Sequence, residues 1–254
     1  MKIRLSQISY LNTLPFDYAL ENADFLKDKS IITKDFPAEC ARKLTNSEAD
    51  IGLIPVAALP DLPNYKIITD YCISCDGEVA TVNLFSDVPL NEIDRIYLDY
   101  QSRTSVLLIK LLAKNFWDIN FEWLESYPGF ENDIKAKTAG LIIGDRCFEK
   151  TNQHKFVYDL GNEWKKFTGL PFVFAVWVST KELSKEILED FNTIFRKSIE
   201  NVDKIVETKP TGAISKETMA NYLKNNIQYN INEEKKIAIS EFFRMLEIQH
   251  KPVF

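Results

Sequence analysis

The chain has 254 residues and a formal net charge of −6, with acidic and basic residues interspersed along its length. This length leaves room for two lobes. The sequence has no basic patch and so does not predict a nucleic-acid surface. An anionic small molecule is still compatible with the charge, because its site needs only a local positive potential.

The start of the chain predicts neither export nor membrane insertion. Polar residues, with Ser6, Gln7 and Asn12 among them, interrupt any apolar segment that could serve as a signal peptide. No apolar run approaches the ~20 residues that a membrane-spanning helix needs. Cys40 and Cys147 are isolated in the sequence, which argues against a disulfide framework. We therefore expect a cytoplasmic protein without a membrane partner.

The chain opens with a strand near residues 3–5, a polar loop over 9–13 and a helix that begins at Pro15. Such an opening is typical of an α/β fold, in which ligands bind at the carboxyl ends of strands. Ser9 and Asn12 are therefore candidate ligand contacts. The alternative is a turn that their own side chains stabilise.

Five further segments extend the first lobe. Runs of β-forming apolar residues predict strands, and a segment that opens with proline predicts a helix. The strands are expected at 31–35, 49–54, 66–71 and 79–85, and the helix at 37–45. Cys72 and Cys75 lie between the last two strands with CxxC spacing. Without a second pair, this spacing is only a weak indication of zinc or redox chemistry.

The segment 95–114, RIYLDYQSRTSVLLIKLLAK, predicts a strand, a polar loop and a helix that is buried on most sides. Ser102, Thr104 and Ser105 then lie at or just before a helix N-terminus, where free N–H groups and the positive dipole end favour an anion. Arg103 adds a planar charge that suits a carboxylate or phosphate. The alternative is that Ser102 or Thr104 caps the helix and Arg103 points to solvent.

A second lobe is expected after a boundary near Pro89. The remaining elements are strands at 121–124, 139–143, 156–159 and 172–178, and amphipathic helices at 183–208, 215–226 and 232–250. We expect the 172–178 strand to return the chain to lobe one and the tail helices to cover that lobe. This order predicts a discontinuous first lobe, 1–86 plus 178–254, and a second lobe, 87–177, with a ligand in the cleft between them.

Catalytic motifs are scarce in this sequence. The only histidines are His154 and His250, and neither follows a predicted strand. The sequence has no nucleotide-binding loop, no nucleophile triad and no cluster with metal-ligand spacing, so we expect no cofactor and no metal. Glu78, Asp99 and Asp145 lie near predicted strand ends and are candidate acids or bases. Each has a structural alternative as a cap or an ion-pair partner.

Six ordered segments carry a resemblance to a known family. They are ISYLNTLPF, DIGLIPVAAL, DGEVATVNLFSDVPL, LDYQSRTSVLLIKLL, GLIIGDRCF and LGNEWKKFTGLPFVFAVWV, and they span most of the first 180 residues. Together they resemble the chorismate dehydratases of the futalosine route to menaquinone. The resemblance implies a two-lobed α/β fold of the type II periplasmic-binding-protein kind, followed by a C-terminal helical segment. It also implies dehydration of chorismate to 3-(1-carboxyvinyloxy)benzoate without a metal or cofactor.

Two other functions are compatible with the same fold. A sister family makes 1,4-dihydroxy-6-naphthoate and uses a histidine base just after a strand that resembles GLII. In this chain the matching position is Gly144, followed by Asp145, which argues against the sister activity. A plain solute-binding protein would normally carry an export signal. A cytoplasmic sensor of an anionic ligand therefore stays open as the alternative to an enzyme.

The expected substrate contacts are Ser9, Asn12, Ser102, Arg103, Thr104, Ser105, Gly144 and Asp145. We expect Arg103 and the helix start to hold one carboxylate of chorismate. Ser9 and Asn12 can hold the other carboxylate or orient the departing hydroxyl. The base stays open between Glu78 and the substrate's own enolpyruvyl carboxylate. The substrate carboxylate ranks slightly higher, because no cleft residue stands out as a tuned base.

Overall fold

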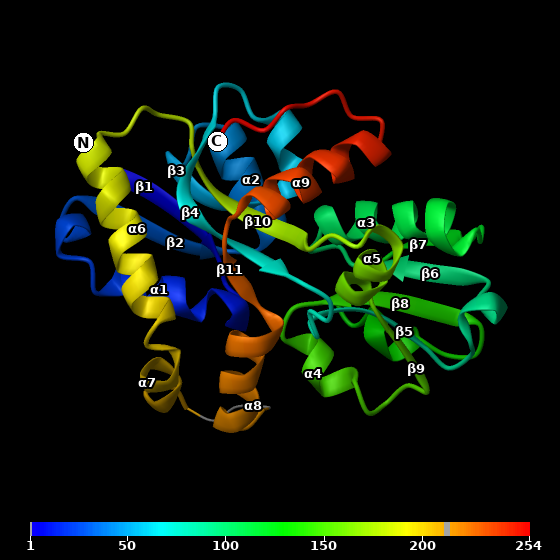
Figure 1. The fold of residues 1–254 in the computed structure, drawn as a ribbon. Coiled ribbons are helices and arrows are strands. Elements are labelled where there is room, and N and C mark those ends of the chain that lie inside the picture. The colour runs from blue at the N-terminus through cyan, green and yellow to red at the C-terminus, as the bar shows by residue number, and fades with distance from the viewer. Residues whose placement is uncertain (1, 211–213) are drawn as a thin grey trace.

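The computed structural model describes residues 2–210 and 214–254, and within them two β-sheets form the centres of two lobes (Figure 1). The first sheet has the order β11-β4-β10-β3-β1-β2 and the second the order β7-β6-β8-β5-β9. The first sheet contains β1 (Ile3–Ile8), β2 (Ser30–Asp35), β3 (Ile51–Pro55), β4 (Lys66–Cys75), β10 (Phe172–Ser179) and β11 (Gln228–Asn230). The second contains β5 (Val82–Ser86), β6 (Arg95–Leu98), β7 (Glu122–Glu125), β8 (Thr138–Ile143) and β9 (Phe156–Asp159).

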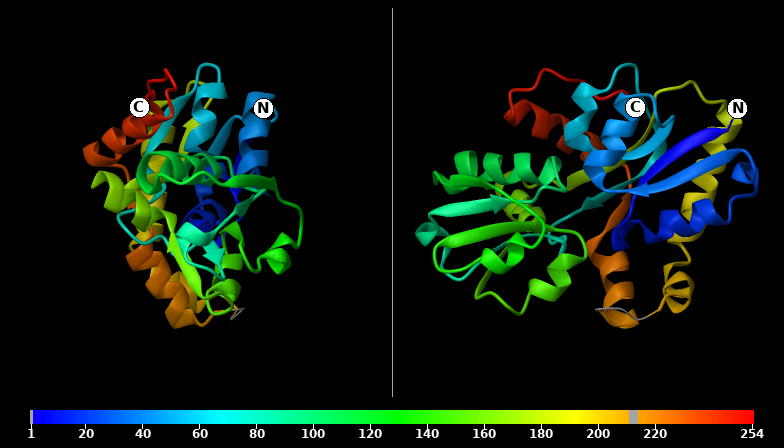
Figure 2. Two further views of the ribbon diagram at one scale, coloured as in Figure 1. Left: turned by 90° about the vertical axis from the view of Figure 1, so that its right-hand side faces the viewer. Right: turned by 180° about the vertical axis from the view of Figure 1, so that it is seen from behind.

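Helices pack around both sheets. They are α1 (Leu14–Glu21), α2 (Pro37–Thr45), α3 (Thr104–Leu112), α4 (Arg146–Lys150), α5 (Leu160–Thr168), α6 (Lys185–Ile199), α7 (Val202–Glu207), α8 (Lys216–Asn221) and α9 (Glu233–Met245). Pro37 opens α2, as the sequence predicts, because proline has no N–H to leave unpaired there. The side chain of Asp159 caps α5, a helix that the sequence analysis did not identify. Figure 2 shows the two lobes side by side.

The two sheets share one arrangement of strands. In the first, β1 lies between the parallel strands β2 and β3, and β10 runs antiparallel between β3 and β4. In the second, β6 lies between the parallel strands β7 and β8, and β5 runs antiparallel between β8 and β9. Each antiparallel strand follows a crossover from the other sheet. The carboxyl ends of the parallel strands therefore meet where the sheets face each other.

The lobe boundaries differ from the expected ones in two places. The segment 82–86 pairs in the second sheet, although we expected it in lobe one, and 172–177 pairs in the first sheet, although we expected it in lobe two. Both strands are mostly buried, and such a strand looks the same in either sheet until its partners are known. The strand expected to end at residue 71 continues through Cys72 to Cys75.

The crossovers therefore fall at 76–81 and 160–171. We call the part built on the first sheet lobe one (2–75, 172–210 and 214–254) and the part built on the second sheet lobe two (76–171). Residue 1 and residues 211–213, which the expected lobe one included, lie outside the described residues.

The C-terminal segment packs on lobe one through aromatic side chains, as expected. The ring centroid of Phe16 in α1 lies 4.7 Å from that of Phe195 in α6, 5.5 Å from that of Tyr229 in β11 and 5.7 Å from that of Trp177 in β10. These rings are buried, and each fully buried side chain of this size contributes roughly 1.5–3 kcal/mol of burial free energy. Tyr222 also places the C-terminal segment beside the cleft, because its hydroxyl lies 2.7 Å from Thr81 Oγ1 in lobe two.

Candidate active site

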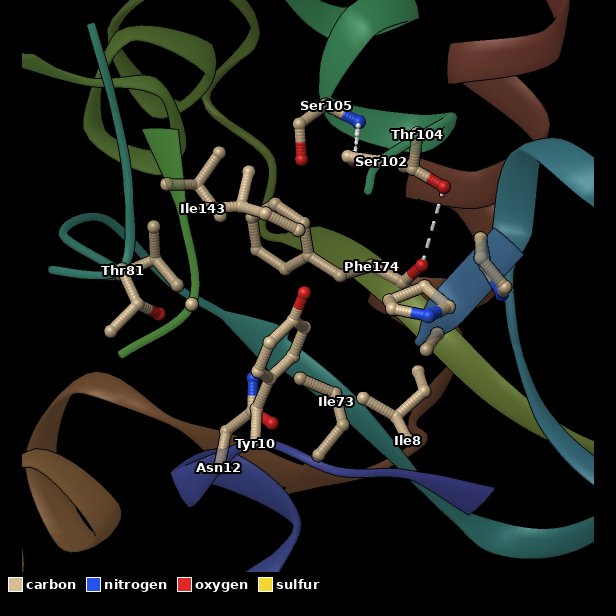
Figure 3. Close-up of a pocket in the computed structure, with 16 residues that line it drawn as sticks. Ile8, Tyr10, Asn12, Ile73, Thr81, Ser102, Thr104, Ser105, Ile143 and Phe174 are labelled. Atoms are coloured by element: carbon tan, nitrogen blue, oxygen red, sulfur yellow. Dashed lines mark hydrogen bonds between the residues drawn. The ribbon is translucent and has the colours of Figure 1, made fainter. Parts of the chain in front are cut away.

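A pocket lies between the lobes where the strand ends of the two sheets meet. Its empty volume is about 520 Å³, which includes space open to solvent. The lining residues are Ile8, Tyr10, Asn12, Pro37, Pro55, Ile73, Val79, Thr81, Val82, Ser102, Thr104, Ser105, Ile143, Gly144, Phe174 and Ala175 (Figure 3). Within the described part of the chain, no charged side chain is among these residues. The pocket therefore combines apolar walls with hydroxyl and amide groups.

Five of the expected substrate contacts line this pocket and three do not. The five are Asn12, Ser102, Thr104, Ser105 and Gly144. They come from both lobes and from three different strand–loop connections. Ser9, Arg103 and Asp145 lie outside the lining, and so does Glu78, the residue considered as a base. Ser9 and Glu78 are exposed.

Arg103, which we expected to hold a carboxylate of the substrate, does not line the pocket. Its guanidinium lies 2.6 Å from the Asp61 carboxylate of lobe one, and both side chains are about half exposed, at 49% and 53%. Arg103 is the N-cap residue of α3. Its ion pair with Asp61 links lobe two to lobe one and leaves the guanidinium already occupied.

Replacing Arg103 with lysine should therefore leave kcat/KM within about threefold of wild type, because an exposed ion pair contributes little and lysine can still pair with Asp61. Steady-state kinetics on chorismate, the substrate that the resemblance implies, measure this effect. A KM that rises more than tenfold would place Arg103 back among the substrate contacts.

Asp145 and Asp99, two of the candidate acids or bases, both act as structural acceptors. The Asp145 carboxylate accepts the backbone N–H of Leu11 at 3.0 Å and so joins lobe two to lobe one. Asp99 accepts the N–H groups of Gln101 and Ile143, each at 2.9 Å, and its side chain is fully buried. Arg146 donates to Asp99 at 2.5 Å. The structural alternative therefore holds for both carboxylates.

The start of α3 presents polar groups to the pocket. Ser102 Oγ accepts the N–H of Ser105 at 3.0 Å and so satisfies one of the free N–H groups in the first turn of α3, although Arg103 is the N-cap residue. Thr104 Oγ1 accepts the N–H of Ala57 at 3.2 Å and thus connects the lobes. The Ser105 hydroxyl points toward the pocket in Figure 3. Ser105 and the positive end of the helix dipole are therefore the groups best placed to meet an anion.

Asn12 faces the start of α3 from the opposite lobe. Its Oδ1 is buried and has no hydrogen-bond partner among the described residues. A buried amide oxygen without a partner costs roughly 1–3 kcal/mol, which a ligand can offset by donating to it. The backbone carbonyl of Asn12 accepts the Tyr229 hydroxyl at 3.0 Å. This bond from the C-terminal segment fixes the loop, a contribution that sequence reasoning missed.

Asp159 holds the pocket wall that the crossover 76–81 provides. Its carboxylate accepts the N–H of Ala80 at 2.6 Å and that of Val79 at 3.1 Å. Val79 and Thr81, the residues on either side of Ala80, both line the pocket. Burial raises the pKa of the Asp159 carboxyl to about 6, although these N–H bonds oppose the shift.

This raised pKa predicts a pH-dependent stability. Between about pH 4 and pH 6 the native state holds a proton that the unfolded chain has released, so the free energy of unfolding should fall by about 2 kcal/mol as pH rises through that range. Chemical unfolding of wild type and Asp159→Asn at several pH values measures this contribution. The difference in the free energy of unfolding between wild type and Asp159→Asn should fall as pH rises from about 4 to 6. A difference that does not change with pH contradicts the raised pKa of Asp159.

The two cysteines of the CxxC spacing are buried in a strand of lobe one. Cys72 and Cys75 carry free thiols and belong to β4. Within residues 2–210 and 214–254, no group of three or more His, Cys, Asp or Glu side chains is arranged to hold a metal ion. Over the same residues, every helix is too short or too polar to cross a membrane.

Comparisons with known proteins agree over almost the whole chain. A family profile described as menaquinone biosynthesis matches residues 3–247. The chain is 24% identical to a chorismate dehydratase from Thermus thermophilus over 273 aligned positions, which cover 96% of this chain and 95% of the relative.

Solved structures resemble the fold. A protein from Archaeoglobus fulgidus has a TM-score of 0.75 and 20% identity, with 97% of each chain covered. A Candida albicans protein that is described as having the generic periplasmic-binding-protein fold has a TM-score of 0.63 and 12% identity, over 98% of this chain and 92% of that one. The expected two-lobed type II periplasmic-binding-protein fold is therefore confirmed.

Proposed function

Because the chain belongs to the menaquinone biosynthesis family, we propose that it is a hydro-lyase that removes water from chorismate to give 3-(1-carboxyvinyloxy)benzoate. The observation that carries this proposal is the family match over residues 3–247. The similarity to a chorismate dehydratase over 96% of the chain supports it and names the substrate. The pocket between the lobes is the proposed site of the reaction.

The pocket offers apolar walls for the ring of chorismate and polar groups for its carboxylates. The cyclohexadiene ring of the substrate can lie against the apolar walls to which Ile8, Ile143 and Phe174 contribute. One carboxylate can lie at the start of α3, where Ser105 and the helix dipole provide donors. Uncharged donors can hold an anion when water is excluded, because their dipoles are already oriented.

The elimination needs a base at the ring carbon that loses its proton. No carboxylate or imidazole is among the pocket residues in the described part of the chain, and Glu78 is exposed outside it. We therefore favour the enolpyruvyl carboxylate of the substrate over Glu78. It takes the proton, the C–H electron pair forms the new ring double bond, and the neighbouring C–O bond breaks. The departing hydroxide and the released proton leave together as water.

The protein's own contribution is orientation and charge stabilisation. Asn12 lies opposite α3, and its Nδ2–H₂ group can donate a hydrogen bond to the departing hydroxyl as negative charge develops on that oxygen. Formation of the aromatic ring supplies the driving force. A fixed substrate geometry can lower the barrier by several kcal/mol on its own, about 7–11 in the best oriented cases.

A count of turnovers separates this enzyme from a ligand sensor of the same fold. Wild-type protein at low concentration should consume chorismate far in excess of one molecule per protein chain. Calorimetric binding of chorismate with consumption that stops at or below one molecule per chain would favour the sensor and contradict the proposed function.

A further inference from the structure

Tyr10 crosses from lobe one to lobe two inside the pocket, and sequence reasoning did not identify it. The loop after β1 carries Tyr10, and its hydroxyl donates to Gln101 Oε1 of lobe two at 2.6 Å. Gln101 is itself fixed, because Arg146 donates to the same oxygen at 3.2 Å and Gln101 Nε2 donates to the Tyr100 hydroxyl at 3.1 Å. The ring of Tyr10 therefore has a defined position only when the lobes are together.

Gly144 forms the seat for this ring. A Cβ atom at Gly144 would lie 2.8 Å from Tyr10 Cε1 and 2.9 Å from Cδ1, closer than any normal contact. The Gly144 N–H donates to Thr81 O at 2.9 Å, so the backbone has little freedom to move aside. Its φ of +70° also favours glycine. The absence of a side chain at 144 thus allows Tyr10 to reach Gln101.

Both residues line the pocket, and Figure 3 shows the Tyr10 ring extending from the loop that also carries Asn12. Burial raises the pKa of the Tyr10 phenol, so the group stays neutral and does not repel a carboxylate. The ring is thus a flat, uncharged wall whose position depends on a residue of the other lobe.

We propose that Tyr10, seated on Gly144 and fixed by Gln101, is a specificity-determining wall residue that sets the width of the closed pocket and holds the substrate ring in the geometry for elimination. This inference rests on the proposed function. It assigns to Gly144 the role of admitting Tyr10, beyond a simple contact with the substrate.

A double-mutant cycle tests the seat. Tyr10→Ala and Gly144→Ala should each lower kcat/KM on chorismate about tenfold or more, and the double variant should be no worse than the poorer single variant, because the clash disappears once the ring is gone. Tyr10→Phe keeps the ring and should lose less activity than Tyr10→Ala. Losses that multiply in the double variant would overturn the proposal.

A matched control isolates the steric effect from backbone strain. Gly169 has a φ of +75°, close to that of Gly144, but a Cβ there would meet no atom within 4 Å. Gly169→Ala should therefore lower the midpoint of thermal unfolding through backbone strain alone, by less than Gly144→Ala does, and should leave kcat/KM within about twofold of wild type. An equal loss of activity in both variants would mean that strain, and not the Tyr10 seat, explains the effect.

The same variants separate a failure of this inference from a failure of the proposed function. Wild-type protein that binds chorismate without consuming it contradicts the proposed function alone. The cycle is then measured with dissociation constants for chorismate, where coupling between Tyr10 and Gly144 supports the seat and independent effects overturn it.

Discussion

Replacing Asn12 with alanine is expected to lower kcat for chorismate dehydration by about 100-fold, with a smaller change in KM. The amide lies in the pocket opposite α3, and its Oδ1 is buried without a partner among the described residues. In the proposed reaction the Asn12 Nδ2–H₂ group donates to an oxygen whose negative charge grows as the C–O bond breaks, so its contribution is largest in the transition state. Alanine removes that bond and leaves the backbone bond to Tyr229 in place.

Asn22→Ala is the matched control for this change. The Asn22 side chain donates to the Tyr18 carbonyl at an exposed position, far from the lining residues of the pocket. The Asn22→Ala substitution removes the same chemical group and should leave kcat unchanged. Steady-state kinetics and thermal unfolding of both variants give the comparison. If Asn12→Ala retains wild-type kcat and KM, Asn12 is only a turn residue.

Replacing Arg146 with methionine is expected to lower the free energy of unfolding by about 3 kcal/mol. The Asp99 side chain is fully buried, and the Arg146 guanidinium pairs with it and with Glu131. Methionine fills much of the space but leaves two carboxylates without their cation. The loss should also reduce activity, because Arg146 helps to fix Gln101, the partner of Tyr10.

Arg103→Met provides the control for this second change. The Arg103 pair with Asp61 is half exposed on both sides, so its removal should cost less than about 1 kcal/mol. Denaturant unfolding monitored by circular dichroism measures both variants. Equal effects of the two substitutions would contradict the assignment of Arg146 to a buried network.

The sequence predicted the fold well where local chemistry decides the outcome. The helix at 37–45 has a proline at its start, and the strand at 156–159 follows the polar segment TNQHK; both match the structure. The sheet membership of 82–86 and 172–177 was not predictable, because a fully buried strand carries no mark of its neighbours. Pairing between segments far apart in the chain decides such cases.

The site was predictable as far as it follows from the ends of strands. Asn12 was identified in this way, because ligands of such sheets bind at the carboxyl ends of strands. Ser105 was identified from its place at a helix start, and Gly144 from the position that matches the histidine of the sister family. Arg103 was misplaced because its long side chain has many rotamers, and its partner Asp61 lies 42 positions away. The residues that support the pocket from the C-terminal segment had no local signal, since only the folded chain brings them there.

The central claim is that this chain dehydrates chorismate, and the identity of the product tests it most directly. Purified wild-type protein mixed with chorismate alone should yield 3-(1-carboxyvinyloxy)benzoate, identified by chromatography and by a mass that is one water lower than that of the substrate. Chorismate also decays slowly without protein, so a sample without protein sets the background. Chorismate that binds but disappears no faster than in that sample, with no product of that mass, would contradict the account.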